Sequence, residues 1–252
     1  PSVVDSCTLC DMCFMITCPY VPPHEFNIDF PHLMLRYRMY QKKIGQLSKI
    51  AMQLAQIDRN AKIGIKFYKV VNWISNVKNK FLRILIQLLT GIDKRVALPR
   101  YNSETFEKYS QRNLEPINKS APAFGRKAVI YSTCFVNFNK KDTGVAALKV
   151  LKKNGIEVKN SYPGCCGMPY LEQANLEKVV EQAKKISAAL LTWVDRGYEV
   201  ITLTASCGLM LKSEWSLLLP SDENIKKLSK HTKDIDEYIV DISNKEGLSQ
   251  GL

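Results

Sequence analysis

The longest regular pattern in the chain is helical and runs from Leu33 to about Ile92. Apolar residues recur there at intervals of three and four positions, the spacing of one face of an α-helix. Lysines and arginines fill most of the other positions. The pattern predicts two or three amphipathic helices, interrupted near Asp58 to Gly64. The apolar positions are Ile44, Leu47, Ile50, Ala51, Leu54, Ala55, Ile63, Phe67, Val70, Val71, Ile74, Val77, Phe81, Leu85, Leu88 and Leu89.

The densest apolar run of this region lies between Phe81 and Leu89. Such a run can enter the interface of a lipid bilayer, or it can face the core of the protein. We expect the core-facing arrangement. No apolar run in the chain reaches the roughly 18 residues that a membrane-spanning helix needs.

The pattern changes after residues 116–125, whose Pro, Ser, Ala and Asn are typical of a linker. Short apolar runs bounded by turn residues then alternate with helical patterns. This order predicts a β-α-β-α-β unit with a parallel sheet and right-handed crossovers. The expected strands are 127–132, 156–160 and 198–205, and the expected helices are 143–153, capped by Asp142, and 175–196.

Three prolines, Pro22, Pro23 and Pro31, punctuate the segment before the helical region. Because proline lacks an amide donor and restricts the residue before it, we expect no regular helix until about His32. His24 and His32 could serve as ligands or proton carriers, but we expect ordinary hydrogen bonds beside a turn.

The net charge of +12 is concentrated in one segment. Between Arg36 and Arg100 there are 15 lysines and arginines against two acids, Asp58 and Asp93. Such local basicity indicates an acidic partner: nucleic acid, an anionic membrane surface or an acidic protein face. A general lysine bias is an equally good explanation. We expect no nucleic acid partner, because the basic segment lacks a recognition motif or a stacking platform.

Eight cysteines occur in a 252-residue chain that shows no secretory signal. This combination favours metal binding over disulfides and a reducing, cytoplasmic setting. The chain begins at Pro1 rather than at a methionine, so we expect it to be a fragment of a longer protein.

Four cysteines, Cys7, Cys10, Cys13 and Cys18, lie within twelve residues. The run is close to the ferredoxin pattern C-x2-C-x2-C-x3-C-P, but four residues separate the last two cysteines where the pattern has three. The run predicts a [4Fe-4S] cluster. Cys18 either completes this cluster or ligates one whose other ligands lie upstream. A zinc knuckle and a small disulfide knot are the alternatives.

The other four cysteines follow the three predicted strands: Cys134 the first, Cys165 and Cys166 the second, Cys207 the third. Parallel strands end at one edge of a sheet, where ligands gather. We therefore expect these four side chains to meet in a second iron-sulfur centre rather than to be unrelated buried cysteines. A helix start at Cys207 would lower the pKa of its thiol.

Three carboxylates, Asp142, Glu172 and Glu214, are predicted to lie near this edge. They could move protons, but solvated surface positions or helix caps are the roles that we expect. The chain has no Gly-rich phosphate loop, no G-x-S-x-G and no His-Glu zinc helix.

These motifs resemble known iron-sulfur oxidoreductases. The CCG turn between Cys134 and Cys207 resembles the cysteine-rich CCG domain of heterodisulfide reductases and their relatives. Together with CTLCDMCFMITCPYVPPHEFNIDFPHLMLR, CFVNFNK, YPGCCGMPYLE and SCGLMLKSEWSLLLP, it makes nearly the whole chain similar to the iron-sulfur subunit of anaerobic glycerol-3-phosphate dehydrogenase. The resemblance implies electron transfer from a flavin-containing dehydrogenase partner towards membrane quinones, without binding of the organic substrate.

Two departures from that family pattern change the expected site. Met210 stands where the pattern commonly ends in a second cysteine, so a four-cysteine centre is more plausible here than a five-cysteine, non-cubane cluster. Neither a second ferredoxin run upstream nor a second CCG domain downstream is present in the sequence, which again indicates a fragment or a split gene.

The predicted organisation is therefore mixed α+β and α/β. Residues 1–35 form a ferredoxin-like cluster segment, residues 36–115 a basic helical region, and residues 126–252 the parallel-sheet cysteine-rich domain. We expect an electron-transfer subunit, cytoplasmic or peripheral on the cytoplasmic membrane face. A zinc-stabilised binding module with basic helices and a thiol-disulfide redox protein using Cys165 and Cys166 are the alternatives.

Overall fold

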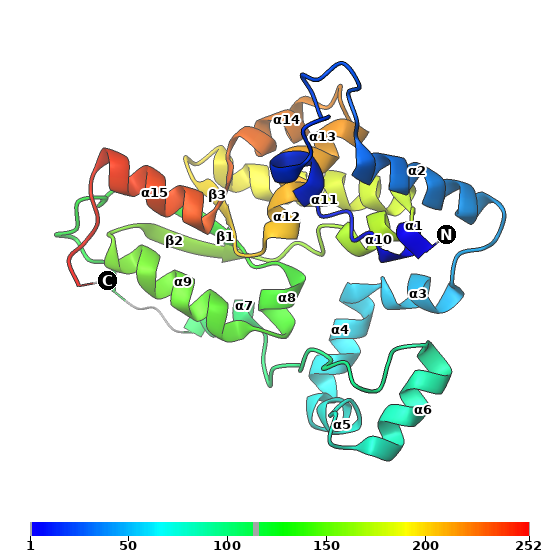
Figure 1. The fold of residues 1–252 in the computed structure, drawn as a ribbon. Coiled ribbons are helices and arrows are strands. Elements are labelled where there is room, and N and C mark those ends of the chain that lie inside the picture. Colours follow the sequence, from blue (N-terminus) through cyan, green and yellow to red (C-terminus); the bar gives the residue numbers. More distant parts are fainter. Residues whose placement is uncertain (1, 113–115, 252) are drawn as a thin grey trace.

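The computed structural model describes residues 2–112 and 116–251. Four parallel strands form one sheet in the spatial order β2, β1, β3, β4 (Figure 1). Their bounds are Lys127–Tyr131 for β1, Glu157–Ser161 for β2, Glu199–Thr202 for β3 and Thr232–Asp234 for β4. The predicted β-α-β-α-β order and its parallel pairing are confirmed, and β4 adds an edge strand that the sequence pattern did not predict.

Strand β1 is central because it is apolar on both faces. Val129 and Tyr131 belong to a first core layer, and Ala128 and Ile130 to a second core layer on the opposite face. Since successive side chains of a strand point to opposite faces, this alternation needs helices on both sides of the sheet. Strand β4 was missed because its three residues, TKD, carry no apolar run.

Helices cover both faces of the sheet (Figure 1). Those contributing to the first core layer are α10 Met168–Glu172, α11 Leu176–Val194, α12 Ala205–Leu209, η2 Met210–Glu214, α13 Trp215–Leu218 and α14 Glu223–Lys230. Those contributing to the second core layer are α7 Phe106–Arg112, α8 Cys134–Phe138, α9 Lys141–Lys153 and α15 Ile235–Lys245.

The predicted helix limits shift by a few residues. Asn175 is the N-cap of α11, as expected, and Gly155 and Gly197 follow the ends of α9 and α11 with positive φ. The expected cap at Asp142 is wrong: α9 begins at Lys141, and Asp142 lies in its first turn, where its charge still favours the helix dipole.

The N-terminal segment packs against the cysteine-rich domain. It contains α1 Ser2–Ser6, a single π-helical turn η1 at Cys13–Thr17, and α2 Phe30–Lys43. Helix α2 starts with Asp29 as its cap and Pro31 in its first turn. Four apolar side chains of this segment join the first core layer: Val4, Leu9, Met34 and Leu35.

The basic region forms more helices than expected. Besides α2 it contains α3 Lys49–Leu54, α4 Ile57–Lys66, α5 Tyr68–Ile74 and α6 Lys80–Thr90. The expected interruption at Asp58 to Gly64 is wrong, because α4 runs through it. Position 64 within this helix requires glycine, because the ring of Tyr101 occupies the space that a Cβ would fill.

Helix α6 turns its apolar face outward, so the expected core-facing arrangement is wrong. Its exposed apolar side chains are spaced by three and four residues along one face, and the helix side chain that is buried is Arg83. Helices α4 to α6 project from the body of the molecule (Figure 1). In the described part of the chain, no helix is long and apolar enough to cross a membrane.

Residues 116–125 have no regular secondary structure, as expected for a linker. The predicted end of the basic region at residue 115 lies outside the described residues, so the domain limits stay a prediction. Phe106 of α7, although it precedes the linker, is fully buried in the second core layer.

Gly144 of α9 allows the close packing of Phe106. A Cβ at this position would lie 2.7 Å from the Phe106 ring. Gly144→Ala should therefore lower the free energy of unfolding by about 1–3 kcal/mol, although alanine is the better helix former by about 1 kcal/mol. Thermal unfolding of the variant measures this change. A second substitution, Phe106→Leu, should restore part of the loss, and an unchanged midpoint in the single variant would contradict this packing.

Candidate functional site

The structure brings four cysteines together at the carboxyl edge of the sheet. Cys134 begins α8 after β1, Cys165 and Cys166 lie in the loop between β2 and α10, and Cys207 lies in α12 after β3. The sulfur atoms of Cys134 and Cys165 are 3.9 Å apart, and those of Cys166 and Cys207 are 3.3 Å apart. None of the eight cysteines, all of which are among the described residues, forms a disulfide. Their proximity follows from the parallel sheet, because its strands all end at this edge.

Burial disfavours ionisation of these thiols. Cys165, Cys166 and Cys207 are almost completely buried, and Cys134 is partly buried. The hydrogen bond with Cys166 favours the Cys207 thiolate, but burial and the neighbouring sulfur atoms outweigh it and raise the pKa of Cys207. The expected lowering of this pKa by the helix start is therefore wrong. Ligation of a metal centre requires thiolates, so the positive charge of the metal has to offset this cost.

The donor set fits an iron-sulfur cluster, which is held by cysteine thiolates. Among the described residues, no three or more Cys, His, Asp or Glu side chains are arranged around one point as a single metal ion would require. Gly164, which precedes Cys165 and Cys166, has φ +152°. Beside it, Gln182 Oε1 is a buried acceptor without a hydrogen-bond partner. The edge thus holds four sulfur atoms and polar groups that protein partners have not fully satisfied.

Asp58 of α4 reaches this edge from the basic region. Its carboxylate accepts a hydrogen bond from the amide of Cys165 at 3.1 Å and one from the hydroxyl of Tyr162 at 2.5 Å. Burial, and next the charge of Asp58, raise the pKa of Tyr162. Sequence reasoning did not assign Asp58 to the site. The only signal was its rarity, as one of two acids in a basic segment.

Met210 is fully buried in the first core layer, which also contains Cys166 and Cys207. In the same layer, the indole of Trp215 donates a hydrogen bond to the carbonyl of Cys166 at 3.1 Å. Trp215 is completely buried and was not singled out from the sequence. Its hydrogen bond fixes the backbone of the CCG turn against the core.

The N-terminal cysteines surround a hollow of about 570 Å³. Cys7, Cys10 and Cys13 line it, together with Phe30 and Pro31 of α2. The loop curls tightly there, with positive φ at Leu9 and Asp11. Cys18 is outside this lining, and its amide donates to the carbonyl of Cys13 at 2.9 Å. Three cysteines of the run therefore share one hollow, and Cys18 does not line it.

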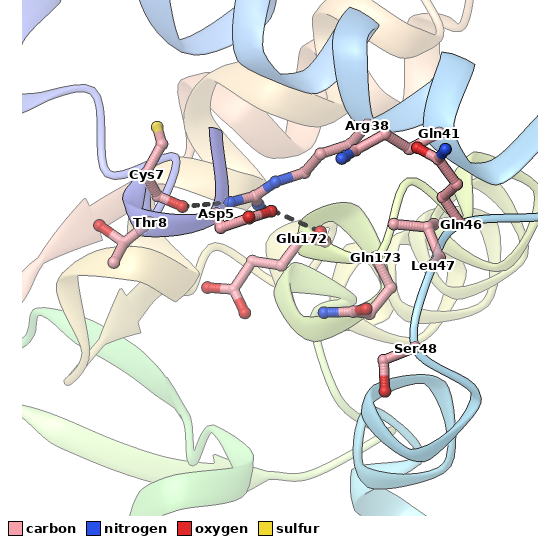
Figure 2. Close-up of a pocket in the computed structure, with 10 residues that line it drawn as sticks. All are labelled: Asp5, Cys7, Thr8, Arg38, Gln41, Gln46, Leu47, Ser48, Glu172 and Gln173. Carbon is pink, nitrogen blue, oxygen red and sulfur yellow. Dashed lines mark hydrogen bonds between the residues drawn. The ribbon is translucent and has the colours of Figure 1, made fainter. Parts of the chain in front are cut away.

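Arg38 ties this loop to the cysteine-rich domain (Figure 2). Its guanidinium donates hydrogen bonds to the carbonyls of Val4, at 2.7 Å, and of Cys7, and to the carbonyl of Glu172 at 3.1 Å. One turn later on α2, Lys42 donates to the carbonyl of Ala174 at 3.2 Å. Both cations therefore bind backbone oxygens that follow the CCG turn. Burial raises the pKa of Glu172, against the opposing influence of Arg38.

His32 forms a second tie between the two parts. Its ring nitrogens lie 2.7 Å from Asp29 Oδ2 and 3.2 Å from Glu214 Oε2. The hydrogen bond with Glu214 is the main cause that raises the pKa of His32 to about 9. Burial, followed by the nearby Glu214, raises the pKa of Asp11 to about 6. Glu214 is thus buried against the N-terminal segment, and the expected solvated position is wrong.

His24 is an ordinary turn residue, as expected. Its ring nitrogen Nδ1 accepts a hydrogen bond from the amide of Phe26 at 3.1 Å, and the ring packs edge-on against Tyr20.

The two groups of cysteines share one apolar support, because Cys7 packs against the core layer that contains Cys166 and Cys207.

The fold and the cysteine geometry agree with comparison to known protein families. Residues 128–212 match the family described as the cysteine-rich domain CCG. Residues 128–212 are thus similar to the CCG cysteine-rich domain, which confirms the resemblance seen in the motifs of this part of the chain. No solved structure shows significant similarity to the chain.

Several curated proteins are similar over parts of their length. A subunit of anaerobic glycerol-3-phosphate dehydrogenase from Escherichia coli is 26% identical over 171 residues, covering 67% of this chain and 42% of the relative. A subunit of the CoM/CoB fumarate reductase from Methanothermobacter marburgensis is 32% identical over 95 residues, or 36% of this chain and 18% of the relative. An uncharacterized iron-sulfur protein from Methanococcus maripaludis is 26% identical over 122 residues, or 47% and 23%. The chain thus spans less than half the length of these relatives.

The raised pKa of His32 has a consequence for stability. A group whose folded pKa, about 9, exceeds its ordinary value of 6.5 stabilises the fold fully below 6.5 and loses that effect as the pH rises through 9. His32→Gln should therefore lower the unfolding midpoint at pH 6 relative to the parent chain, and the difference should shrink towards pH 10. Thermal unfolding across this range measures it. His24→Gln is the control, and a pH-independent difference for His32→Gln would contradict the assignment.

Proposed function

We propose that this chain is an iron-sulfur electron-transfer protein. The carrying observation is the meeting of Cys134, Cys165, Cys166 and Cys207 at one edge of the sheet, with two sulfur pairs at 3.9 and 3.3 Å. All-thiolate donor sets are typical of iron-sulfur clusters. In this proposal the four cysteines hold one centre, and the CCG turn supplies two of its ligands.

A second centre, a [4Fe-4S] cluster, belongs to the N-terminal run in this proposal. Cys7, Cys10 and Cys13 share the hollow and provide three thiolates. Cys18 is the fourth ligand after a rearrangement of its loop, or it ligates another cluster as the last cysteine of a ferredoxin run does. The bound clusters would supply one-electron transfer, and the protein sets their potentials through burial, hydrogen bonds and nearby charge.

Two of the relatives are subunits of larger oxidoreductases, a glycerol-3-phosphate dehydrogenase and a fumarate reductase. We infer that this chain likewise serves a larger cytoplasmic complex, taking electrons from a flavin-dependent dehydrogenase and passing them towards a quinone or another acceptor. The substrate chemistry then belongs to the partner.

Peripheral membrane contact is part of the proposal, and helix α6 supports it. Phe81 and Leu88 are 77% and 78% exposed, and Trp73 of α5 is 64% exposed. The exposed apolar residues are flanked by lysines and arginines of the same basic segment. Apolar side chains that enter the interface, surrounded by cations that attract anionic headgroups, are the features of an interfacial helix.

The alternatives fit these observations less well. A thiol-disulfide enzyme needs an accessible thiol of low pKa. Cys165 and Cys166 are instead buried, with raised pKa values, since further sulfur atoms and burial outweigh the hydrogen bonds that favour their thiolates. A zinc-stabilised module is distinguished from the proposal by its metal content.

Metal analysis tests the central proposal. Protein purified without oxygen should contain about eight irons with matching sulfide and give an EPR signal after reduction. The double variant Cys165→Ser, Cys166→Ser should retain about four irons, because only the N-terminal cluster remains. Met210→Leu is the control and should retain both centres. Zinc without iron, or an iron content that the double variant leaves unchanged, would contradict two cysteine-held centres.

Vesicle binding tests the membrane contact. Phe81→Ser combined with Leu88→Ser should weaken binding to phosphatidylglycerol-containing vesicles by about tenfold or more, because two large apolar side chains no longer enter the interface. Co-sedimentation measures the bound fraction. Val240→Ser, at an exposed apolar position of α15, is the control. Equal binding by the double variant and the parent chain would contradict an interfacial role for α6.

A further inference from the structure

Arg38 places a buried positive charge beside the N-terminal cysteine loop. The side chain is only 8% exposed. Its hydrogen bonds go to three backbone carbonyls, those of Val4, Cys7 and Glu172. Figure 2 shows the bonds to Cys7 and Glu172. Among the described residues, none of the salt bridges involves Arg38. The guanidinium therefore bonds backbone dipoles and no carboxylate, while the carboxylates of Asp5 and Glu172 line the same pocket (Figure 2).

This charge is close to the backbone of a candidate cluster ligand. One guanidinium nitrogen, Nη2, donates both to the Cys7 carbonyl and to the Val4 carbonyl of α1. Cys7 lines the hollow that it shares with Cys10 and Cys13, and it also lines the pocket on the Arg38 side. Arginine stays protonated at all relevant pH values, so the charge is permanent.

We propose that the charge of Arg38 raises the reduction potential of the cluster held by the N-terminal cysteine loop. The inference rests on the proposed function, since it needs that cluster. Reduction adds one electron, supplied by a flavin-dependent partner or by dithionite, and the cluster gains one negative charge. A buried cation nearby stabilises the more negative, reduced state, because screening by water is weak there. Arg38 acts as a positioning and tuning residue, and it is not a ligand.

The shift in reduction potential is expected to be larger for one of the two centres. Arg38 bonds the carbonyl of Cys7 itself, whereas its contact with the CCG side is the carbonyl of Glu172, six residues beyond Cys166. Removing the charge should therefore shift the potential of the N-terminal cluster more than that of the centre at the sheet edge. The second centre is an internal reference within each sample.

Redox titration followed by EPR tests the inference on the full chain, purified without oxygen. Arg38→Gln and Arg38→Met remove the charge, and Arg38→Lys keeps it with a different shape. Arg36→Gln removes an equal charge from an exposed position on the same helix. We expect both neutral Arg38 variants to shift the N-terminal midpoint to more negative potential. Arg38→Lys and Arg36→Gln should stay close to the parent value.

Iron content keeps every outcome interpretable. Neutral variants that load the cluster and keep the parent midpoint would overturn the inference. If neither neutral variant loads it but Arg38→Lys does, the charge acts on cluster loading, which is not the proposed effect, and the inference is overturned. If Arg38→Lys also fails to load, the shape of the guanidinium and not its charge is required, and the inference is wrong. A parent chain without N-terminal iron refutes the proposed function instead, and this result is distinct from the others.

Discussion

The parallel sheet imposes the constraint on which the site depends. Because β1, β2 and β3 run in one direction, the three segments that carry the cysteines have to leave the sheet at the same edge. Cys134 and Cys207, which are 73 residues apart in the sequence, therefore lie in one small region of thiols. The helices on both faces bury that region, and neighbouring sulfur atoms and burial raise the pKa of its thiols. A metal centre bound there would have to supply the positive charge that stabilises the thiolates.

Helix α2 holds the N-terminal cysteine loop in place against the cysteine-rich domain. In the short loop around Cys7 to Cys13, two of the three cysteines are exposed. Its position depends on Val4 and Leu9 in the shared core, and on the side chains of His32 and Arg38, which contact η2 and α10. Two groups of cysteines thus rest on one rigid support, which favours a fixed separation between them.

Much of this architecture was predictable from local sequence. The strands at 127–131 and 157–161 are short apolar or alternating runs between turn residues, and cysteines that follow successive parallel strands must converge. The remaining features depend on tertiary contacts without a local signal. Strand β4 is polar and gains its place by pairing with β3. Asp58 and Arg38 act across 107 and 134 residues of sequence, so no spacing rule could assign them. The outward face of α6 has the same periodicity as a buried one.

Helix α4 connects the cysteine-rich edge with the projecting helices. Asp58, in its first turn, holds the amide of Cys165, while Ile63 and the adjoining Phe67 are exposed on the side of the projecting helices. A rigid helix of ten residues moves as one body. Asp58 thus attaches the basic helical region directly to the backbone of a buried cysteine, so the position of the projecting helices and the position of the CCG turn are fixed by one hydrogen bond on one helix.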